Sequence, residues 1–330
     1  MRPVAIVTGA TGQGGSYLCE FLLEKGYHVK CLVRRSTYPI QASNLKPYLG
    51  EVSLYEGDVL DQSSIFSVLS DCGHFERIEV YNLAGQSHAG TSYNCPKFTF
   101  EVNTLSILNI LETIRQLGIQ NKCRIYQASS SEMFGKVEEH PQNESTVFNP
   151  QTLYGVSKVA AHCLIKNYRE MYGLYACSGI LYNHESPRRS DKFVTQKIIQ
   201  GLKSGKCFEI GNLESRRDWG HARDYVEAMW ITLQQDKPDD YVVATGKTHS
   251  VREFIEIAVN KLNKTITWSG ENENEYGMID GEVVVKVSKA FYRPYNVGLL
   301  VGDSSKIEKL GWSRKYDIDG LIEDMLKNTE

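Results

Sequence analysis

The stretch Val4-Ala5-Ile6-Val7-Thr8-Gly9-Ala10-Thr11-Gly12-Gln13-Gly14-Gly15 decides the fold of this chain. Its apolar first half is typical of a buried strand that leads directly into a glycine-rich turn. Glycines at positions 9, 12 and 15 allow the backbone to turn tightly and to approach a pyrophosphate at the N-terminus of the following helix. We therefore expect this turn to bind a dinucleotide, through Gly9, Thr11, Gly12, Gln13 and Gly15.

Beyond this turn, apolar runs alternate with helical patterns as far as about residue 182. The expected strands are 4–7, 28–33, 52–55, 80–83, 124–128 and 176–181, and the expected helices are 17–24, 63–69, 103–117 and 154–172. Such alternation implies right-handed crossovers between parallel strands. The sequence thus predicts an α/β fold with a Rossmann-type, doubly wound parallel sheet that binds its ligands at the carboxyl ends of the strands.

The alternation of strands and helices ends at the polar stretch 183–189, where a smaller α/β lobe is expected to begin. Residues 226–233 and 241–245 look like a helix and a strand that return to the sheet, whereas 251–262, 283–287 and 318–326 fit the lobe. We therefore divide the chain into a dinucleotide-binding domain, 1–182 with 222–250, and a substrate-binding lobe, 183–221 with 251–330. No internal repeat or low-complexity linker separates them, so the two parts should pack around a shared cleft.

Composition excludes several classes of protein. The chain has 330 residues, of which 41% are hydrophobic and 23% charged. Its formal net charge of -3 lacks the excess of basic residues that is typical of a nucleic-acid-binding protein. No apolar run is long enough to span a bilayer, and the first residues look like a buried strand and not like a cleavable signal. The eight cysteines are scattered without a Cys-x-x-Cys pair, which favours buried thiols in a reducing cytoplasm. Neither they nor the histidines show metal-ligand spacing, so we expect no metal.

The ends of the later strands carry further candidate cofactor residues. Arg34-Arg35-Ser36 follows the second strand, where an acidic residue would hold an adenosine ribose hydroxyl. Two guanidinium groups suit a 2′-phosphate instead, so NADP is favoured over NAD, although a solvated basic loop would read the same way. Asp58 follows the third strand at a place suited to the adenine, and the segment 83–87 ends the fourth strand beside the expected dinucleotide.

A pair of segments further along carries the chemistry. Tyr154 and Lys158 are four residues apart on a predicted helix, so the ammonium can favour the phenolate of a group whose pKa is otherwise about 10. That arrangement makes a base. A Tyr/Lys pair at this spacing is common by chance, but here it follows the run Ser129-Ser130-Ser131-Glu132, which adds hydroxyls and a carboxylate.

Several longer strings give the chain a resemblance to a known family. They are Val33-Arg34-Arg35-Ser36, Ala84-Gly85-Gln86-Ser87-His88, Tyr126-Gln127-Ala128-Ser129, Asn183-His184-Glu185-Ser186-Pro187-Arg188-Arg189, Arg217-Asp218-Trp219-Gly220-His221-Ala222 and Tyr292-Arg293-Pro294. With the Gly-x-x-Gly-x-x-Gly and Tyr-x-x-x-Lys motifs, they resemble the extended short-chain dehydrogenase/reductase superfamily. Within it they resemble the GDP-mannose 4,6-dehydratase family along nearly the whole chain.

The resemblance implies a set of site residues. Catalytic positions match Ser130, Glu132, Tyr154 and Lys158. Contacts with NADP are implied for Gly9, Thr11, Gly12, Gln13, Gly15, Arg34, Arg35, Asp58, Val59, Leu83, Ala84, Gln86, Ser87, Tyr154, Lys158, His184 and Arg189. Contacts with GDP-mannose are implied for Ser87, Ser130, Glu132, Tyr154, Asn183, Val194, Lys197, Gly211, Arg217, Arg293 and Asn296. Among these, Lys197, Arg217 and Arg293 would supply the cations that a diphosphate requires.

The chain departs from the family pattern at three positions. Ser130 stands where a threonine is usual, which keeps the hydroxyl and loses the branched methyl. Gly14 replaces the usual aspartate of the turn, and Asn296 stands where a glutamate commonly meets the substrate ribose.

The activity implied by the resemblance is the conversion of GDP-D-mannose to GDP-4-keto-6-deoxy-D-mannose, a step toward GDP-fucose or GDP-rhamnose. Tyr154 would take the C4 hydroxyl proton as hydride leaves C4, Glu132 would remove the C5 proton, and Ser130 would help to protonate the departing C6 hydroxyl. Hydride would then return to C6. The same site could also reduce the C4 ketone with NADPH to give GDP-D-rhamnose. The family also implies a homodimer or homotetramer.

Three alternatives share parts of this pattern. A sugar-nucleotide 4-epimerase uses the Tyr154/Lys158 pair but needs no carboxylate at position 132. A dTDP-glucose-type dehydratase generally has an Asp-Glu pair, where this chain offers Ser131-Glu132. An NADP-sensing module without activity would not need the four catalytic positions, all of which are filled here.

Overall fold

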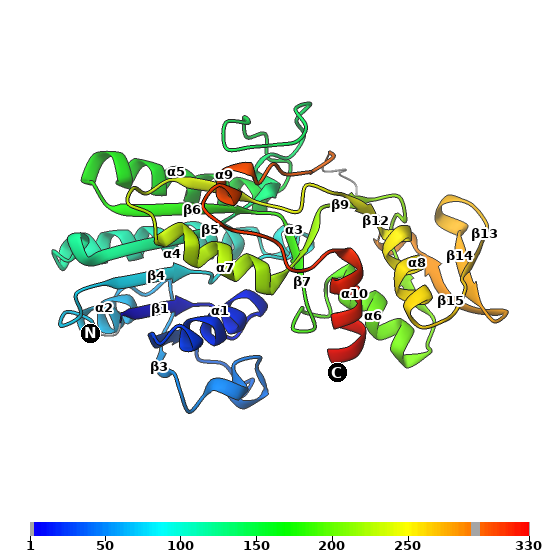
Figure 1. Cartoon of the computed structure of the whole chain (residues 1–330), viewed down its shortest axis with the longest axis horizontal. Coiled ribbons are helices and arrows are strands. Elements are labelled where there is room, and N and C mark those ends of the chain that lie inside the picture. The colour runs from blue at the N-terminus through cyan, green and yellow to red at the C-terminus, as the bar shows by residue number, and fades with distance from the viewer. Residues whose placement is uncertain (1–2, 292–297, 330) are drawn as a thin grey trace.

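The computed structural model describes residues 3–291 and 298–329, which form a larger sheet domain and a smaller lobe (Figure 1). The larger part is built on a seven-stranded sheet with the order β11-β6-β5-β4-β1-β2-β3, in which every neighbouring pair is parallel. Its strands are β1 (Val4–Thr8), β2 (His28–Val33), β3 (Ser53–Glu56), β4 (Ile78–Asn82), β5 (Cys123–Ser130), β6 (Tyr175–Leu181) and β11 (Asp240–Val243). This arrangement confirms the predicted Rossmann-type α/β fold.

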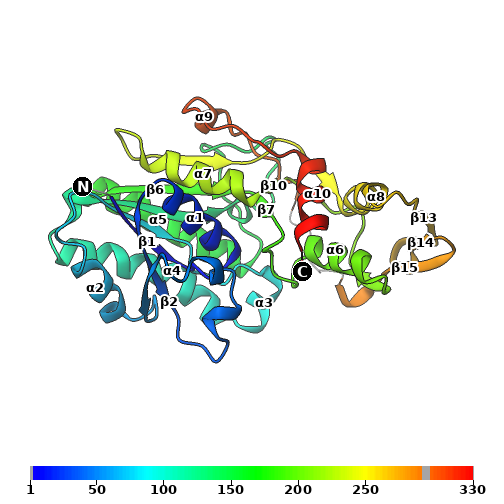
Figure 2. The same cartoon turned by 60° about the horizontal axis from the view of Figure 1, so that its bottom comes forward.

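Helices cover both faces of the sheet (Figure 2). The helices of this part are α1 (Gln13–Glu24), α2 (Gln62–Ser70), α3 (Ala89–Asn94), α4 (Pro96–Gln116), α5 (Leu153–Tyr172) and α7 (Ala222–Leu233). Strand β1 shows why two covers are needed: Ala5 and Val7 pack with α1 and α7, while Val4 and Ile6 pack with α2, α4 and α5. Successive side chains of a strand point to opposite faces, so a wholly apolar strand requires a helical layer on each side.

The smaller lobe has its own core and its own sheet, with the strand order β13-β14-β15-β8. Its elements are α6 (Val194–Ser204), β8 (Phe208–Ile210), α8 (Val251–Lys261), β13 (Thr267–Ser269), β14 (Tyr276–Ile279), β15 (Glu282–Val287) and α10 (Ile318–Asn328). Ile198, Phe254 and Leu321, one from each of these helices, are fully buried together. The lobe thus closes around an apolar centre that is separate from the cores beside the large sheet.

Two short strand pairs lie where the chain passes between the two parts. They are β7 (Asn183–Glu185) with β10 (Trp219–His221), which is parallel, and β9 (Arg216–Arg217) with β12 (His249–Ser250), which is antiparallel. The remaining helical elements are α9 (Ser305–Glu308) and short 3₁₀ turns at Ile40–Ala42, Lys46–Tyr48, Gln120–Lys122, Ser131–Met133, Asn272–Asn274 and Lys289–Phe291.

The chain returns to the large sheet twice. Helix α7 packs against α1, and β11 adds to the edge of the sheet next to β6. Leu300, Ile307 and Trp312, which the sequence analysis assigned to the lobe, also pack against the sheet domain, Leu300 beside β6 and the other two beside α7. The division into domains remains a prediction, and this packing extends the sheet's share of the chain beyond residues 222–250.

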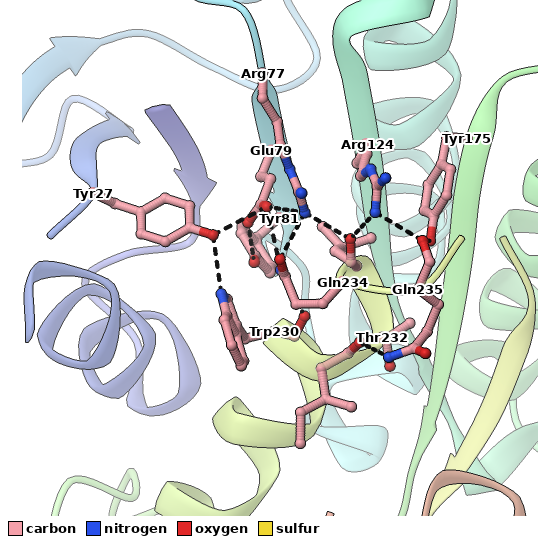
Figure 3. Close-up of polar contacts among 12 residues, drawn as sticks. Tyr27, Arg77, Glu79, Tyr81, Arg124, Tyr175, Trp230, Thr232, Gln234 and Gln235 are labelled. Carbon is pink, nitrogen blue, oxygen red and sulfur yellow. Dashed lines mark hydrogen bonds and ion pairs between the residues drawn. The ribbon is translucent and has the colours of Figure 1, made fainter. Parts of the chain in front are cut away.

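The amino-terminal ends of the central strands are closed by a buried polar network (Figure 3). Glu79 of β4 is fully buried, and its carboxylate lies 2.6 Å from Nη2 of Arg77 and accepts hydrogen bonds from Tyr81 at 2.7 Å and Tyr27 at 3.1 Å. Arg77 and Arg124 both donate to the carbonyl of Leu233, at 2.8 and 2.6 Å. Two cations therefore face the negative end of the α7 dipole, an arrangement that stabilises the helix.

The cysteines are all free thiols among the residues described. Five are buried, but Cys95, Cys163 and Cys207 are exposed, so the expectation of buried thiols is wrong for these three. Within residues 3–291 and 298–329, no helix combines the length and the apolar character needed to cross a membrane.

Candidate active site

The glycine-rich turn brings the carboxyl ends of β1 and β4 into close contact. Gly9 has a φ of +71°, and a side-chain carbon there would lie 2.8 Å from the backbone of both Leu83 and Ala84. A side-chain carbon at Gly15 would lie 2.2 Å from the carbonyl oxygen of Gly9. Helix α1 begins just beyond, with Gly12 as its N-cap and no side-chain cap. Its first amide groups have no partners within the helix, which makes this helix start suited to a phosphate.

Gln13 contributes to the site by holding segments together. Its side chain is buried, donates to the carbonyl of His184 at 2.9 Å and accepts from the hydroxyl of Ser186 at 2.7 Å. The amide thus joins the start of α1 to the segment 183–189. Thr11 and Gly12 are exposed in the same turn.

The predicted 2′-phosphate residues lie at the carboxyl end of β2. Arg34 and Arg35 are exposed, and Nε of Arg35 lies 3.3 Å from a carboxylate oxygen of Glu56, the last residue of β3. Asp58 is half-buried and accepts a hydrogen bond from the amide of Leu60 at 2.9 Å. Val59 is buried next to it.

The segment after β4 is held by a residue that the sequence analysis did not select. Asn103 of α4 is buried, accepts from the amide of Gln86 at 2.9 Å and donates to Ser157 of α5 at 3.0 Å. A side-chain carbon at Gly85 would lie 2.7 Å from its oxygen and 3.7 Å from Nζ of Lys158. A signal was available, because an asparagine on the apolar face of a helix needs a partner. Exposed Ser87 completes the segment.

The four residues predicted to be catalytic come together at the end of β5 and the start of α5. Ser130 ends β5, and its hydroxyl accepts the amide of Glu132 at 3.2 Å. Thr152 caps α5 by accepting the amide of Gly155 at 2.9 Å and donates to the Glu132 carboxylate at 3.4 Å. The cap therefore aligns the first turn of α5 with the carboxylate. Buried Tyr154 and Lys158 follow on this helix, with the Lys158 ammonium 5.8 Å from the centre of the Tyr154 ring.

Burial shifts the pKa values of Tyr154 and Lys158 in the directions that favour their neutral forms. It raises the pKa of the Tyr154 phenol to about 12, against the lowering effects of a hydrogen bond with Ser130 and the charge of Arg189, while the Glu132 carboxylate raises it further. Burial also lowers the pKa of Lys158 to about 8. The ammonium donates to the carbonyl of Ala128 at 2.8 Å. The hydrogen bond with Ser130 and the charge of Arg189 therefore favour the Tyr154 phenolate, while the predicted effect of Lys158 on this phenol stays a prediction.

The segment 183–189 adds a histidine and an arginine to this end of the sheet. His184 stacks on Tyr225 with 4.7 Å between ring centres, and burial lowers its pKa to about 4, so the ring is neutral. The guanidinium of Arg189 lies 3.4 Å from the centre of the Phe193 ring, and its Nε is 3.0 Å from the buried carboxylate of Glu185. The Phe193 ring and the Glu185 carboxylate thus hold Arg189 in place. From there, its positive charge lowers the pKa of Tyr154.

The predicted substrate residues of the lobe are only partly brought together. Lys197 of α6 lies 3.5 Å above the Phe291 ring, and a side-chain carbon at Gly211 would lie 2.5 Å from the Phe291 carbonyl. Val194 begins α6, and Asn183 begins β7. Arg217 lies in β9 and donates to the carbonyl of Arg216 at 2.6 Å. Arg293 and Asn296 lie outside the described residues.

Fold and site together define a class. A dinucleotide-type glycine turn at the crossover of a parallel sheet, beside a Tyr/Lys pair at the start of the helix after β5, is the arrangement of an extended short-chain dehydrogenase/reductase. The chain matches the family model described as GDP-mannose 4,6 dehydratase over residues 6–325. It therefore belongs to the GDP-mannose 4,6-dehydratase family.

Relatives from distant organisms support this membership. The chain is 45% identical to GDP-mannose 4,6 dehydratase of Drosophila melanogaster, an alignment covering 98% of this chain and 85% of that protein. It is 44% identical to the human protein of that name, covering 98% and 91%, and 42% identical to the one from Vibrio cholerae, covering 99% and 93%.

Solved structures agree on the fold. UDP-glucose 4-epimerase of Thermus thermophilus in complex with NAD has a TM-score of 0.81 at 23% identity, covering 99% of this chain and 98% of that one. RMD from Pseudomonas aeruginosa in complex with NADPH has a TM-score of 0.73 at 21% identity, with 99% of each chain covered. At these identities the likeness establishes the fold alone.

Proposed function

We propose that this protein is a hydro-lyase that converts GDP-D-mannose to GDP-4-keto-6-deoxy-D-mannose with bound NADP. The observation that carries the proposal is the grouping of Glu132 with Ser130 and Tyr154 at one site, in a chain of this family. A carboxylate beside the Tyr/Lys pair supplies the base that elimination needs and that a 4-epimerase does not.

The geometry supports NADP as the cofactor. At Gly9 and Gly15 the neighbouring backbone leaves no room for a side chain, and at Gly85 the side chain of Asn103 fills that space. Glycine is expected where backbone must be approached this closely. Thr11 and Gly12, exposed just before α1, suit the pyrophosphate, Arg34 and Arg35 suit the 2′-phosphate, and Asp58 follows the end of the neighbouring strand. NADP, when bound, accepts hydride and returns it.

Side chains of the protein would remove and donate the protons of the reaction. Tyr154 would take the proton of the C4 hydroxyl, and because burial raises its pKa to about 12, it needs cationic help to become a base. Arg189 and the Lys158 ammonium supply positive charge near it. The C4 carbonyl that results acidifies the neighbouring C5–H, so Glu132 can remove that proton. Ser130 and Glu132 would then help to protonate the departing C6 hydroxyl, and one water leaves.

We further propose that the protein acts in the cytoplasm. We also propose that it forms a homodimer through α4 and α5. These helices expose large apolar side chains, among them Phe98 at 41%, Leu105 at 37% and Val156 at 42%. A second copy covering them would remove apolar area from water. Light scattering after size exclusion tests the mass, and a monomer would contradict the dimer.

The function is tested by incubating the purified protein with GDP-mannose and no added cofactor. Mass spectrometry should show a product lighter by one water, and the Glu132→Gln variant should form it about 10²–10³-fold more slowly. A product of unchanged mass with inverted configuration at C4 would identify an epimerase instead. Absence of any conversion would overturn the proposal.

A further inference from the structure

Glu56 faces the predicted 2′-phosphate site from the neighbouring strand. It is the last residue of β3 and pairs in register with Val33, the last residue of β2, two positions before Arg35. Its carboxylate lies 3.3 Å from Nε of Arg35, with 66% of the Glu56 side chain and 87% of the Arg35 side chain exposed. One of the two arginines that suit a 2′-phosphate therefore already has an anionic partner.

We infer that Glu56 is a specificity-determining residue: its carboxylate competes with the 2′-phosphate for Arg35 and narrows the preference for NADP over NAD. This inference rests on the proposed use of a nicotinamide dinucleotide. Glu56 ends β3, and Asp58 follows two positions later, so the end of this strand carries two carboxylates beside the strand that leads to Arg34 and Arg35. The four formal charges sum to zero, where the arginine pair alone suggests a cationic site.

The physical chemistry predicts the direction. Exposed ion pairs of this kind are weak, so a phosphate can displace the carboxylate from Arg35. The carboxylate nevertheless stays close, because it is fixed to the end of β3, and it repels a group of the same sign. NAD carries only a hydroxyl at the same place and has no charge there for Glu56 to repel.

Glu56→Gln therefore keeps the size of the side chain and removes its charge. After bound nucleotide is stripped from the full-length protein, calorimetry should show that Glu56→Gln binds NADP about fivefold more tightly than the parent, with NAD affinity unchanged within about twofold. Adenosine 2′-phosphate, which carries the phosphate without the nicotinamide, should show the same gain. In about 1 M salt the gain should fall below twofold, because charges at an exposed site are then screened.

Glu51→Gln is the matched control. Glu51 is also an exposed glutamate, but it precedes β3 and so lies at the opposite end of that strand from Glu56. It should leave the ratio of NADP to NAD affinities unchanged.

Three results would overturn the inference: an unchanged ratio in Glu56→Gln, an equal gain in Glu51→Gln, or weaker NADP binding in Glu56→Gln. The last would mean that Glu56 positions Arg35 for the phosphate. If the parent protein binds neither dinucleotide, the proposed function itself fails, and the inference fails with it.

Discussion

The two ends of the large sheet use similar polar side chains in opposite ways. At the amino end, Glu79 is surrounded by Arg77 and two tyrosines at 2.6–3.1 Å, so its charge is satisfied within the fold. At the carboxyl end, the carboxylate of Glu132 accepts a longer hydrogen bond, 3.4 Å from the hydroxyl of Thr152. The comparison indicates that one end serves stability and the other leaves its reactive groups available to a ligand.

Tyr154→Phe should have the largest effect, because it removes the proton acceptor of the first step and little else. We expect turnover of GDP-mannose to fall by about 10⁴-fold, the upper end of the range of about 10²–10⁴-fold that is typical of a general acid or base. The free energy of unfolding, measured by thermal denaturation, should change by less than about 1 kcal/mol, since the ring still fills its buried site. If Tyr154→Phe lowered the free energy of unfolding by as much as we expect for Glu79→Gln at the amino end, the carboxyl end would also serve stability.

Glu132→Gln should reduce dehydration by about 10²–10³-fold while leaving the first oxidation possible. The amide keeps the shape of the side chain but cannot take a proton. Reduced-nicotinamide absorbance should therefore build up on mixing with GDP-mannose, and a variant that dehydrates normally would remove Glu132 from the mechanism.

Glu79→Gln tests the amino end. The Glu79 carboxylate is fully buried, although 35% of the Arg77 side chain is exposed. Removing its charge should lower the free energy of unfolding by about 3 kcal/mol, with the Michaelis constant and turnover of the folded enzyme unchanged. Urea unfolding measures the first and steady-state kinetics the second. Exposed Glu76→Gln, three residues earlier, serves as the control and should change neither.

Lys158→Met tests the electrostatic cost of the carboxyl end. Because burial lowers the pKa of Lys158 to about 8, the folded protein releases this proton while the unfolded chain still holds it, between pH 8 and the ordinary lysine value. The unfolding free energy of the parent should therefore rise with pH from 8 to 9.5, relative to the variant, by about 2 kcal/mol. If the unfolding free energies of the two proteins changed in parallel with pH, Lys158 would not be buried as a cation.

Ser130→Thr should have the smallest effect. It keeps the hydroxyl that interacts with Tyr154 and adds one methyl group, so turnover should change by less than about threefold. A large loss would show that the hydroxyl at the end of β5 is not placed beside the substrate.

The carboxyl ends of β1 and β2 were largely predictable from sequence, because glycine spacing and apolar runs are local signals. Gly9, Gly15 and the arginines after β2 lie where the motif predicts them. The partner of Arg35 was not predictable, since Glu56 lies at the end of another strand, 21 residues later. Asn103 could be recognised as a buried amide in need of a partner, but the sequence does not show that this partner is the segment after β4. The lobe was harder still, because Lys197 and Gly211 meet at Phe291, about 80 or more residues later, with no motif in common.

The most direct test of the account follows a deuterium placed at C4 of GDP-mannose. If one site oxidises C4, eliminates water and reduces C6 without releasing the hydride, NMR of the product should show the deuterium at C6, with one water lost. Deuterium that is lost to solvent or free cofactor, or that remains at C4, would contradict the central claim that the carboxyl end of the sheet carries out all three steps on one bound sugar.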